Sequence, residues 1–208
     1  LVFRAYPSNA KVLSSIPIMA TMSTAAASST PLTVVVTGAS SGIGLELCKQ
    51  LAARGDKVFA TCRKLASSAS GVDQISSVAG DVTIIEGVDV ASDGVGAVLA
   101  ASPLAGVPVD VLVHNAGSVN GTRDVSAGEI MSEQDLDVVS MDRMRAAFEV
   151  NTLGPLRVQQ ALNAQMKSPG GKVAIVSTGL GSISDNGSGG KYAYRVSKAG
   201  ANMVAKSM

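Results

Sequence analysis

A tyrosine and a lysine lie four residues apart near the end of the chain, at Tyr194 and Lys198. On a helix this spacing puts both side chains on one face, where a phenol and an ammonium can act on the same substrate atom. A phenol ordinarily titrates near pKa 10, but a cation within about 4 to 6 Å favours the phenolate. We therefore expect Lys198 to lower the pKa of Tyr194. Taken alone, the spacing is more typical of an ordinary pair on a helix surface.

A second pattern that can support chemistry is the glycine-rich stretch Thr-Gly-Ala-Ser-Ser-Gly-Ile-Gly at 37–44. It follows an apolar run and precedes a helical pattern. Glycines there permit a tight turn, and free amides at the positive end of a helix stabilise a pyrophosphate. A plain strand-to-helix turn is the alternative, but the flanking elements favour a dinucleotide site. The expected cofactor contacts in this turn are Gly38, Ser40, Ser41, Gly42, Ile43 and Gly44.

The elements that must position these residues alternate along the chain from Pro31 onward. Apolar runs rich in Val and Ile predict strands at 32–37, 57–61, 82–86, 109–114 and 172–177, and helical patterns lie at 43–54, 92–101, 141–167 and 192–208. Strands without in-and-out alternation are covered by helices on both faces. The pattern predicts an α/β fold with a Rossmann-type, doubly wound parallel sheet. We expect 65–80 to be a loop with one weak helix, and 118–140 a loop with a short helix.

In this order, the motifs resemble those of the short-chain dehydrogenase/reductase family in its non-extended branch. The resemblance begins at the Thr-Gly and Gly-Ile-Gly of the glycine-rich stretch and continues to the end of the chain. Val-Asp-Val at 88–90 is similar to the family's Asp-Val pair, Asn-Ala-Gly at 115–117 matches its Asn-Ala-Gly motif, and Tyr194 and Lys198 match its catalytic pair. Residues 181–195, which include Tyr-Ala-Tyr-Arg, resemble a carbonyl reductase branch similar to the C-factor and sniffer proteins.

The resemblance implies roles for four catalytic residues. Tyr194 would be the proton donor, and Lys198 would also hold the nicotinamide ribose. Asn151 matches the asparagine that holds a proton-relay water, although an ordinary helix asparagine is the alternative. The family's substrate-orienting serine is replaced here by Thr178, which keeps a hydroxyl but adds a methyl group. Ser177 or Ser182 is the alternative for that role.

The cofactor implied is NADP(H), with NAD(H) as the alternative. The second strand is followed by Cys-Arg-Lys at 62–64, without an acidic residue for the ribose hydroxyls of NAD. Arg63 offers a planar fork for a 2′-phosphate, unless Arg63 and Lys64 only solubilise a loop. The remaining cofactor contacts expected from the resemblance are Asp89, Val90, Asn115, Ala116, Gly117, Tyr194 and Lys198.

Composition restricts the other classes of function. The chain has 208 residues, 46% hydrophobic and 16% charged, with a net charge of +1. We expect one domain over 31–208, with no nucleic-acid partner and no membrane span. Two cysteines and one histidine do not form a metal-site pattern, so no metal is expected. Cys48 and Cys62 are expected to be reduced and buried, and His114 to be a core or strand-end residue.

The segment 1–30 is poor in acidic residues and rich in Ser and Ala. It is expected to be a disordered leader or a targeting segment, or translated sequence upstream of Met19 or Met22, so the predicted location is cytoplasmic or organellar. In the resembling family two more strands and a mobile lid follow the catalytic helix, so we expect the domain to be truncated at its C-terminal end and to lack the last strands.

The expected activity is hydride transfer between the nicotinamide and a carbonyl or alcohol carbon of a small-molecule substrate that the sequence does not identify. One alternative is an inactive dinucleotide-binding scaffold, and another is a member acting on a different bond, as an enoyl reductase or epimerase. The resemblance also implies a homodimer or homotetramer, joined through the helices at 141–167 and from 192 onward.

Overall fold

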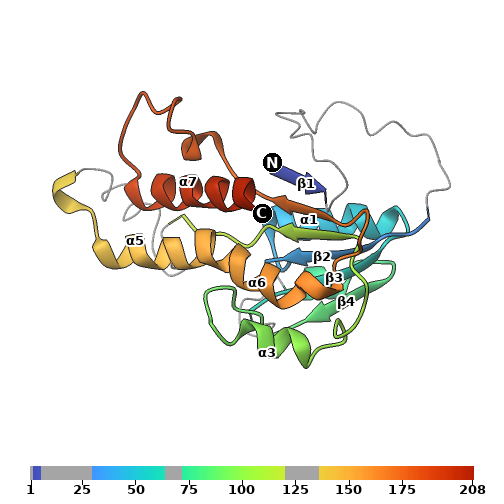
Figure 1. Ribbon diagram of the computed structural model, residues 1–208. Coiled ribbons are helices and arrows are strands. Elements are labelled where there is room, and N and C mark those ends of the chain that lie inside the picture. Colours follow the sequence, from blue (N-terminus) through green and yellow to red (C-terminus); the bar gives the residue numbers. More distant parts are fainter. Residues whose placement is uncertain (1, 6–29, 64–71, 120–135) are drawn as a thin grey trace.

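The computed structural model of the protein describes residues 2–5, 30–63, 72–119 and 136–208. These residues form a twisted sheet with helices on both faces (Figure 1). Five strands run parallel in the order β6-β5-β2-β3-β4. Their bounds are β2 (Thr33–Thr37), β3 (Lys57–Thr61), β4 (Val82–Ile85), β5 (Val111–His114) and β6 (Lys172–Ile175). The predicted Rossmann-type parallel α/β sheet is confirmed.

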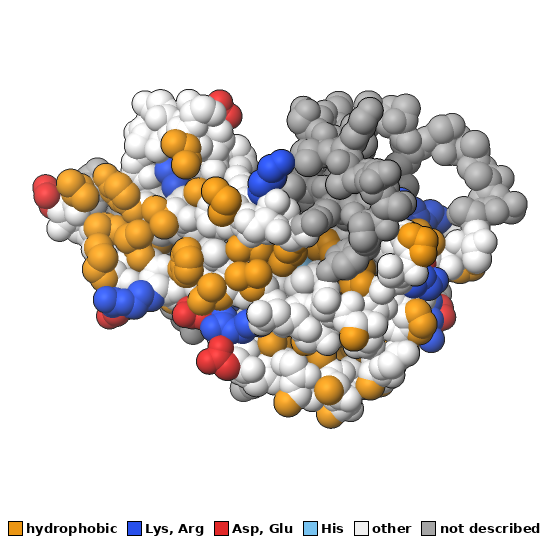
Figure 2. Space-filling view, viewed as in Figure 1, with side chains coloured by type: hydrophobic (Ala, Val, Ile, Leu, Met, Phe, Trp, Pro, Cys, Tyr) orange, Lys and Arg blue, Asp and Glu red, His pale blue; other side chains and the backbone are white. Residues whose placement is uncertain are grey.

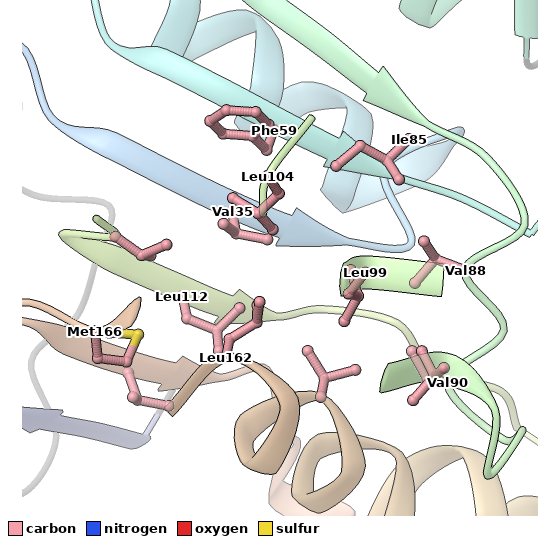
Figure 3. Packing of buried hydrophobic residues seen from close by; sticks show 14 residues of the cluster. Val35, Phe59, Ile85, Val88, Val90, Leu99, Leu104, Leu112, Leu162 and Met166 are labelled. Carbon is pink, nitrogen blue, oxygen red and sulfur yellow. The ribbon is translucent and has the colours of Figure 1, made fainter. Parts of the chain in front are cut away.

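The central strand β2 is apolar throughout because both of its faces are covered. Val35 pairs with Phe59 on one neighbour and Leu112 on the other, and all three belong to one buried cluster. Leucines from the helices on that side complete the cluster (Figure 3). Val34 and Val36 belong to a second cluster on the opposite side. Alternate valines thus anchor two helical layers, which is the arrangement that continuous apolar strands predict.

The helices divide between these two layers. The second cluster contains Leu45 and Cys48 of α1 (Gly42–Ala53), and α2 (Val72–Ser76) lies beside α1. The first cluster contains residues of α3 (Val95–Ala100) and α6 (Gly154–Leu162). The last helix, α7 (Tyr192–Ser207), packs on Ile175 of β6 and along α5 (Met141–Phe148).

The helix predicted over 141–167 is found as a continuous helical stretch from 141 to 165, but the structure is not α-helical throughout it. A π-helical segment, η2 (Glu149–Leu153), separates α5 from α6, and a 3₁₀ turn, η3 (Asn163–Gln165), follows. Pro155 explains the interruption: it has no N–H for the carbonyl of Asn151 four residues earlier, and its ring crowds that carbonyl. The distortion therefore falls on a predicted catalytic residue.

Two of the expected loops contain short helical turns. The helix α2 lies within 65–80, and the 3₁₀ turn η1 (Leu136–Val138) lies within 118–140. The rest of these two predictions falls partly on 64–71 and 120–135, outside the described residues. None of the helices in the described ranges has the length and apolarity that a bilayer crossing requires.

The chain's first described segment differs from its prediction. Residues 1–30 were expected to lie outside the fold, but β1 (Val2–Ala5) pairs antiparallel with β6, with Val2 opposite Ile175 and Ala5 opposite Lys172. An unpaired β6 edge would leave a row of backbone donors and acceptors without partners, and β1 satisfies them. Residues 6–29 lie outside the described residues.

Candidate active site

The glycine turn lies at the carboxyl end of β2, and the order of the parallel strands reverses between β2 and its neighbour β5. Such a switch point is where open α/β sheets bind ligands. Gly38 adopts φ +67°, and a Cβ there would lie 2.8 Å from Ala116 Cα. A Cβ on Gly44 would collide with Asn115 Nδ2 and with the Gly38 carbonyl. Both glycines are required because the turn packs directly against the segment that follows β5.

The turn also leaves the start of α1 available to an anion. Ser41 precedes the helix, and its side chain makes no capping bond to the first-turn amides. The first turn contains no acidic residue. Gly42 adopts φ +56° with no atom within 4 Å of its Cβ position, so its backbone conformation requires glycine while the space beside it stays open. Free amides, the positive helix end and this space fit the pyrophosphate of a dinucleotide.

A cavity of about 250 Å³ opens beside the turn. Ten of the predicted cofactor-binding residues line it: Gly38, Ser40, Ser41, Ile43, Arg63, Asp89, Val90, Asn115, Ala116 and Gly117. Four other predicted residues do not line it. Gly42 and Gly44 shape the turn, while Tyr194 and Lys198 belong to α7.

The sequence motifs did not identify four further lining residues, which are Cys62, Val88, Ser118 and Val150. Three of them adjoin a predicted contact in the sequence: Cys62 precedes Arg63, Val88 precedes Asp89, and Ser118 follows Gly117. These three residues could have been predicted to line the cavity, because each lies shortly after the carboxyl end of a strand. Val150 reaches the cavity from the π-helical segment, and no motif pointed to it.

Asn115 joins the end of β5 to the glycine turn. Its Nδ2 donates to the carbonyls of Thr37 at 2.9 Å and Gly38 at 3.1 Å. The buried Thr37 Oγ1 also accepts from the backbone amides of Asn115 and Ala116, both at 3.0 Å. Thr37 was quoted in the glycine motif, but its anchoring role was not predicted. The Asn-Ala-Gly segment thus supports the wall of the cavity.

Asn151 connects this wall to α7. Its side chain is 1% exposed and bonds to the backbone of Ser118 twice, accepting at 2.9 Å and donating at 2.7 Å. Its Nδ2 also donates to Ser197 Oγ at 2.9 Å, and that hydroxyl donates to the Tyr194 carbonyl. Both Nδ2 hydrogens of Asn151 are thus committed to Ser118 and Ser197, so the side chain ties these two segments together. Its main-chain carbonyl lacks an α-helical donor because the residue four positions later is Pro155, and we expect this carbonyl to hold the predicted proton-relay water.

Lys198 is 5% exposed, and its Nζ donates to the Val176 carbonyl at 3.0 Å. The ammonium lies 5.8 Å from the centre of the Tyr194 ring. A Cβ added to Gly117 would lie 3.4 Å from this Nζ and 3.2 Å from Asn151 Oδ1. Gly117 lines the cavity, so the helix that carries Tyr194 and Lys198 meets the predicted dinucleotide site at this glycine.

The expected effect of Lys198 on Tyr194 is not found. Burial raises the pKa of the Tyr194 phenol above 10.0, and burial lowers the pKa of the Lys198 ammonium. Desolvation disfavours the charged form of each group, and it is the cause of both shifts. The phenol is therefore protonated at neutral pH, which suits a proton donor.

The three hydroxyls considered for orienting the substrate follow β6, and they differ in their hydrogen bonds. Ser177 Oγ donates to Asn202 Oδ1 at 2.6 Å, so its proton is committed. Ser182 Oγ pairs with Ser184 Oγ at 3.2 Å. Thr178 Oγ1 accepts from the Leu180 amide at 3.3 Å and caps the 3₁₀ turn η4 (Gly179–Gly181). Among the described contacts, Thr178 keeps its proton for another acceptor, which favours Thr178 over Ser177 as the group that orients a substrate.

The described ranges contain no cluster of three or more His, Cys, Asp or Glu side chains suited to a metal. His114 is buried beside Gln159 Oε1 at 3.4 Å, and burial lowers its pKa to about 4. It is a neutral residue at the end of β5. Cys48 and Cys62 are both buried, and desolvation raises the pKa of Cys48 to about 12.

Comparisons with known proteins agree with this arrangement. A dehydrogenase of Rhodococcus sp. (strain AD45), 1-hydroxy-2-glutathionyl-2-methyl-3-butene dehydrogenase, is 38% identical over 173 residues, which cover 83% of this chain and 67% of that protein. The C-signal protein of Myxococcus xanthus is 40% identical over 102 residues, 49% of this chain and 55% of that protein. The predicted resemblance to the C-factor branch is thereby confirmed.

A solved structure from Burkholderia multivorans, described as a short-chain dehydrogenase/reductase with bound NADP, is similar in fold. It is 30% identical with a TM-score of 0.69, and the match covers 86% of this chain and 72% of that chain. This chain thus spans between about half and three quarters of the length of these three relatives. Residues 32–208 match the short chain dehydrogenase family. The chain belongs to the short-chain dehydrogenase/reductase family of oxidoreductases.

Proposed function

We propose that this chain binds NADP(H) in the cavity beside the glycine turn and catalyses reduction of a carbonyl, or oxidation of an alcohol, on a small-molecule substrate. One observation carries the proposal. Gly117 lines the cavity and lies between Asn151 and Lys198, so a nucleotide bound along the glycine turn would reach the phenol-bearing helix. The NADP in the Burkholderia multivorans structure and the dehydrogenase activity in the name of the Rhodococcus relative support it.

Each side chain has a separate part in the reaction. When bound, the nicotinamide supplies or accepts the hydride. Tyr194 holds its proton at neutral pH and gives it to the substrate oxygen. Thr178 donates a hydrogen bond to the same oxygen, so two donors stabilise the charge that develops there. Lys198 and a water at the Asn151 carbonyl return a proton to the phenol, and Lys198 also binds the nicotinamide ribose.

Arg63 supports NADP(H) over NAD(H). It borders the cavity directly after β3, and no acidic residue stands at 61–64 to bind the ribose hydroxyls. A guanidinium recognises a phosphate with two parallel hydrogen bonds.

We also propose that the protein forms a homodimer through α5 and α7. Met141 and Phe148 of α5 and Val196 and Met203 of α7 are exposed, with Met203 67% accessible. Hydrophobic side chains gather over these helices in Figure 2. In a twofold dimer the same face of each copy packs against the other, so a second copy of the chain would bury these exposed hydrophobic side chains.

The decisive experiment is Tyr194→Phe, which removes one hydroxyl. NADPH oxidation on a panel of aldehydes and ketones is expected to vanish, while the dissociation constant of NADPH stays within about twofold, because the phenol acts on the substrate oxygen. Tyr192→Phe, on the same helix, is the matched control and should keep full turnover. Turnover by Tyr194→Phe would contradict the proposed role of Tyr194 as proton donor. A wild-type chain that binds NADPH without turnover would instead favour the inactive dinucleotide-binding scaffold.

A further inference from the structure

Arg195 directly follows the candidate proton donor. All three nitrogens of its guanidinium donate hydrogen bonds to residues that precede α7. Its Nε donates to the carbonyls of Gly189 at 3.2 Å and Gly190 at 3.1 Å. Its Nη2 donates to Ser188 Oγ at 2.8 Å, and its Nη1 to the Leu180 carbonyl at 3.4 Å. One planar group thus ties two separate parts of the chain to the first turn of the catalytic helix.

The bound segment has an unusual backbone. Gly189, Gly190 and Lys191 all adopt positive φ, at 62°, 63° and 52°. Lys191 is the one residue other than glycine with positive φ in the described part of the chain, and it immediately precedes α7. Left-handed backbone is disfavoured for a residue with a Cβ and persists where its surroundings hold it. Figure 1 shows this segment arching away from the sheet before it returns to the start of α7. The carbonyls of the left-handed run are the ones that Arg195 Nε contacts.

The second segment that Arg195 contacts is the turn that follows Thr178. Leu180 lies in η4, which Thr178 caps, and Gly181 packs so closely on α7 that a Cβ there would lie 2.9 Å from the Lys198 carbonyl carbon. The contact to Leu180 therefore couples the Thr178 turn to the backbone that introduces Tyr194. The two hydroxyls that must meet one substrate oxygen lie on these two segments.

We propose that Arg195 is a positioning residue that sets the relation between the Thr178 hydroxyl and the Tyr194 phenol. This inference rests on the proposed function, since it concerns the geometry of the same reaction. A guanidinium can serve the left-handed run and the η4 carbonyl at once because its five donors are held in a rigid fork. A lysine carries its donors on one nitrogen, so it does not reproduce the spread of the guanidinium's three nitrogens over the two segments.

The test compares Arg195→Ala and Arg195→Lys with the wild-type chain. The value of kcat on a reactive aldehyde is expected to fall roughly 10- to 100-fold in the alanine variant, because small misplacements of reacting groups cost that much. Arg195→Lys should recover only part of the loss. The dissociation constant of NADPH should change less than about twofold in both, since Arg195 does not border the cavity. Arg54→Ala is the matched control: Arg54 also holds a nearby group, Asp56, through its side chain, but at the far end of α1.

A double-mutant cycle separates positioning from a loss of stability. Gly190→Ala strains the left-handed run directly, so its effect on kcat should be much smaller in the Arg195→Ala background than in the wild type, because both changes disturb one unit. Strictly additive effects on kcat, or an Arg195→Ala variant with wild-type kcat, would overturn the proposal while leaving the proposed function intact. A wild-type chain without turnover would overturn both.

Discussion

Asn115 donates two hydrogen bonds to Thr37 across the ends of neighbouring parallel strands. The Asn115 side chain donates to the Thr37 carbonyl, and the Thr37 hydroxyl accepts from the Asn115 amide. The two residues are 78 positions apart in the sequence. These two bonds fix the glycine turn to the segment that leads to Gly117, so the two sides of the cavity are held together.

Asn115→Asp should weaken both the fold and nucleotide binding. The change keeps the size of the side chain but replaces two donated hydrogen bonds with a carboxylate oxygen facing two carbonyls. We expect a loss of about 2 to 3 kcal/mol in the free energy of unfolding, measured by urea denaturation, and weaker NADPH binding. Asn186→Asp is the control, because the exposed Asn186 Oδ1 accepts from the Gly189 amide and an aspartate retains that acceptor. Equal stability in the two variants would contradict the anchoring role.

Replacing Arg63 should change the choice of nucleotide. In Arg63→Ser the dissociation constant of NADPH is expected to rise roughly 10- to 100-fold, the worth of one or two charge-assisted hydrogen bonds, while that of NADH stays the same. Both constants are measurable by fluorescence titration. Lys49→Ser, which removes an exposed cation from α1, should alter neither. A parallel loss for both nucleotides would mean that Arg63 contacts a group they share.

The parts of the site that the sequence predicted are those that depend on short-range pattern. Apolar runs located the five parallel strands, because strands buried on both faces have no polar positions. The glycine turn was evident because it stands between a strand and a helix. Parallel strands bring their carboxyl ends to one edge, so the segments after β2, β3 and β5 meet at the cavity as the motifs predicted.

The parts that were missed depend on contacts between distant segments. The break after Phe148 follows from Pro155, but a proline alone does not reveal that the chain adopts a π-helical segment. The bonds of Asn151 to Ser118 and Ser197 join residues 33 and 46 positions apart. The pKa of Tyr194 was predicted in the wrong direction because burial, which the sequence does not show, dominates it.

The raised pKa of Tyr194 predicts different pH profiles for the two directions of the reaction. Reduction needs the protonated phenol, so its rate should stay level through neutral pH and fall only above pH 10, the phenol's ordinary pKa. Oxidation needs the phenolate, so its rate should climb through the same range. Initial rates between pH 6 and about 11 in both directions test this. A change of slope near pH 7 in either profile would show that the bound cofactor and Lys198 lower the pKa of Tyr194, as the sequence predicted.

The hydrophobic face of α5 and α7 predicts a twofold assembly. Met203→Glu places a charge in the middle of that face, and a buried unpaired charge is costly at an interface. Light scattering coupled to gel filtration should show a dimer for the wild type and a monomer for this variant. Ala53→Glu adds the same charge to an exposed position on α1, on the other face of the sheet, and should remain dimeric. A monomeric wild-type chain would overturn the proposed interface.

His114 should make the fold sensitive to mild acid. Its ordinary pKa is 6.5, and burial lowers it to about 4 in the folded chain, so between these values the unfolded chain binds a proton that the folded chain does not. Stability therefore rises with pH through this window and is lost as pH falls from 6.5 toward 4. The two pKa values differ by about 2.5, equivalent to roughly 3 kcal/mol in full and about 2 kcal/mol by pH 5. Because the chain has a single histidine, no other imidazole contributes. Urea denaturation at pH 7 and pH 5 should show this loss in the wild type and little of it in His114→Gln; an equal loss in both would assign the acid sensitivity to carboxylates.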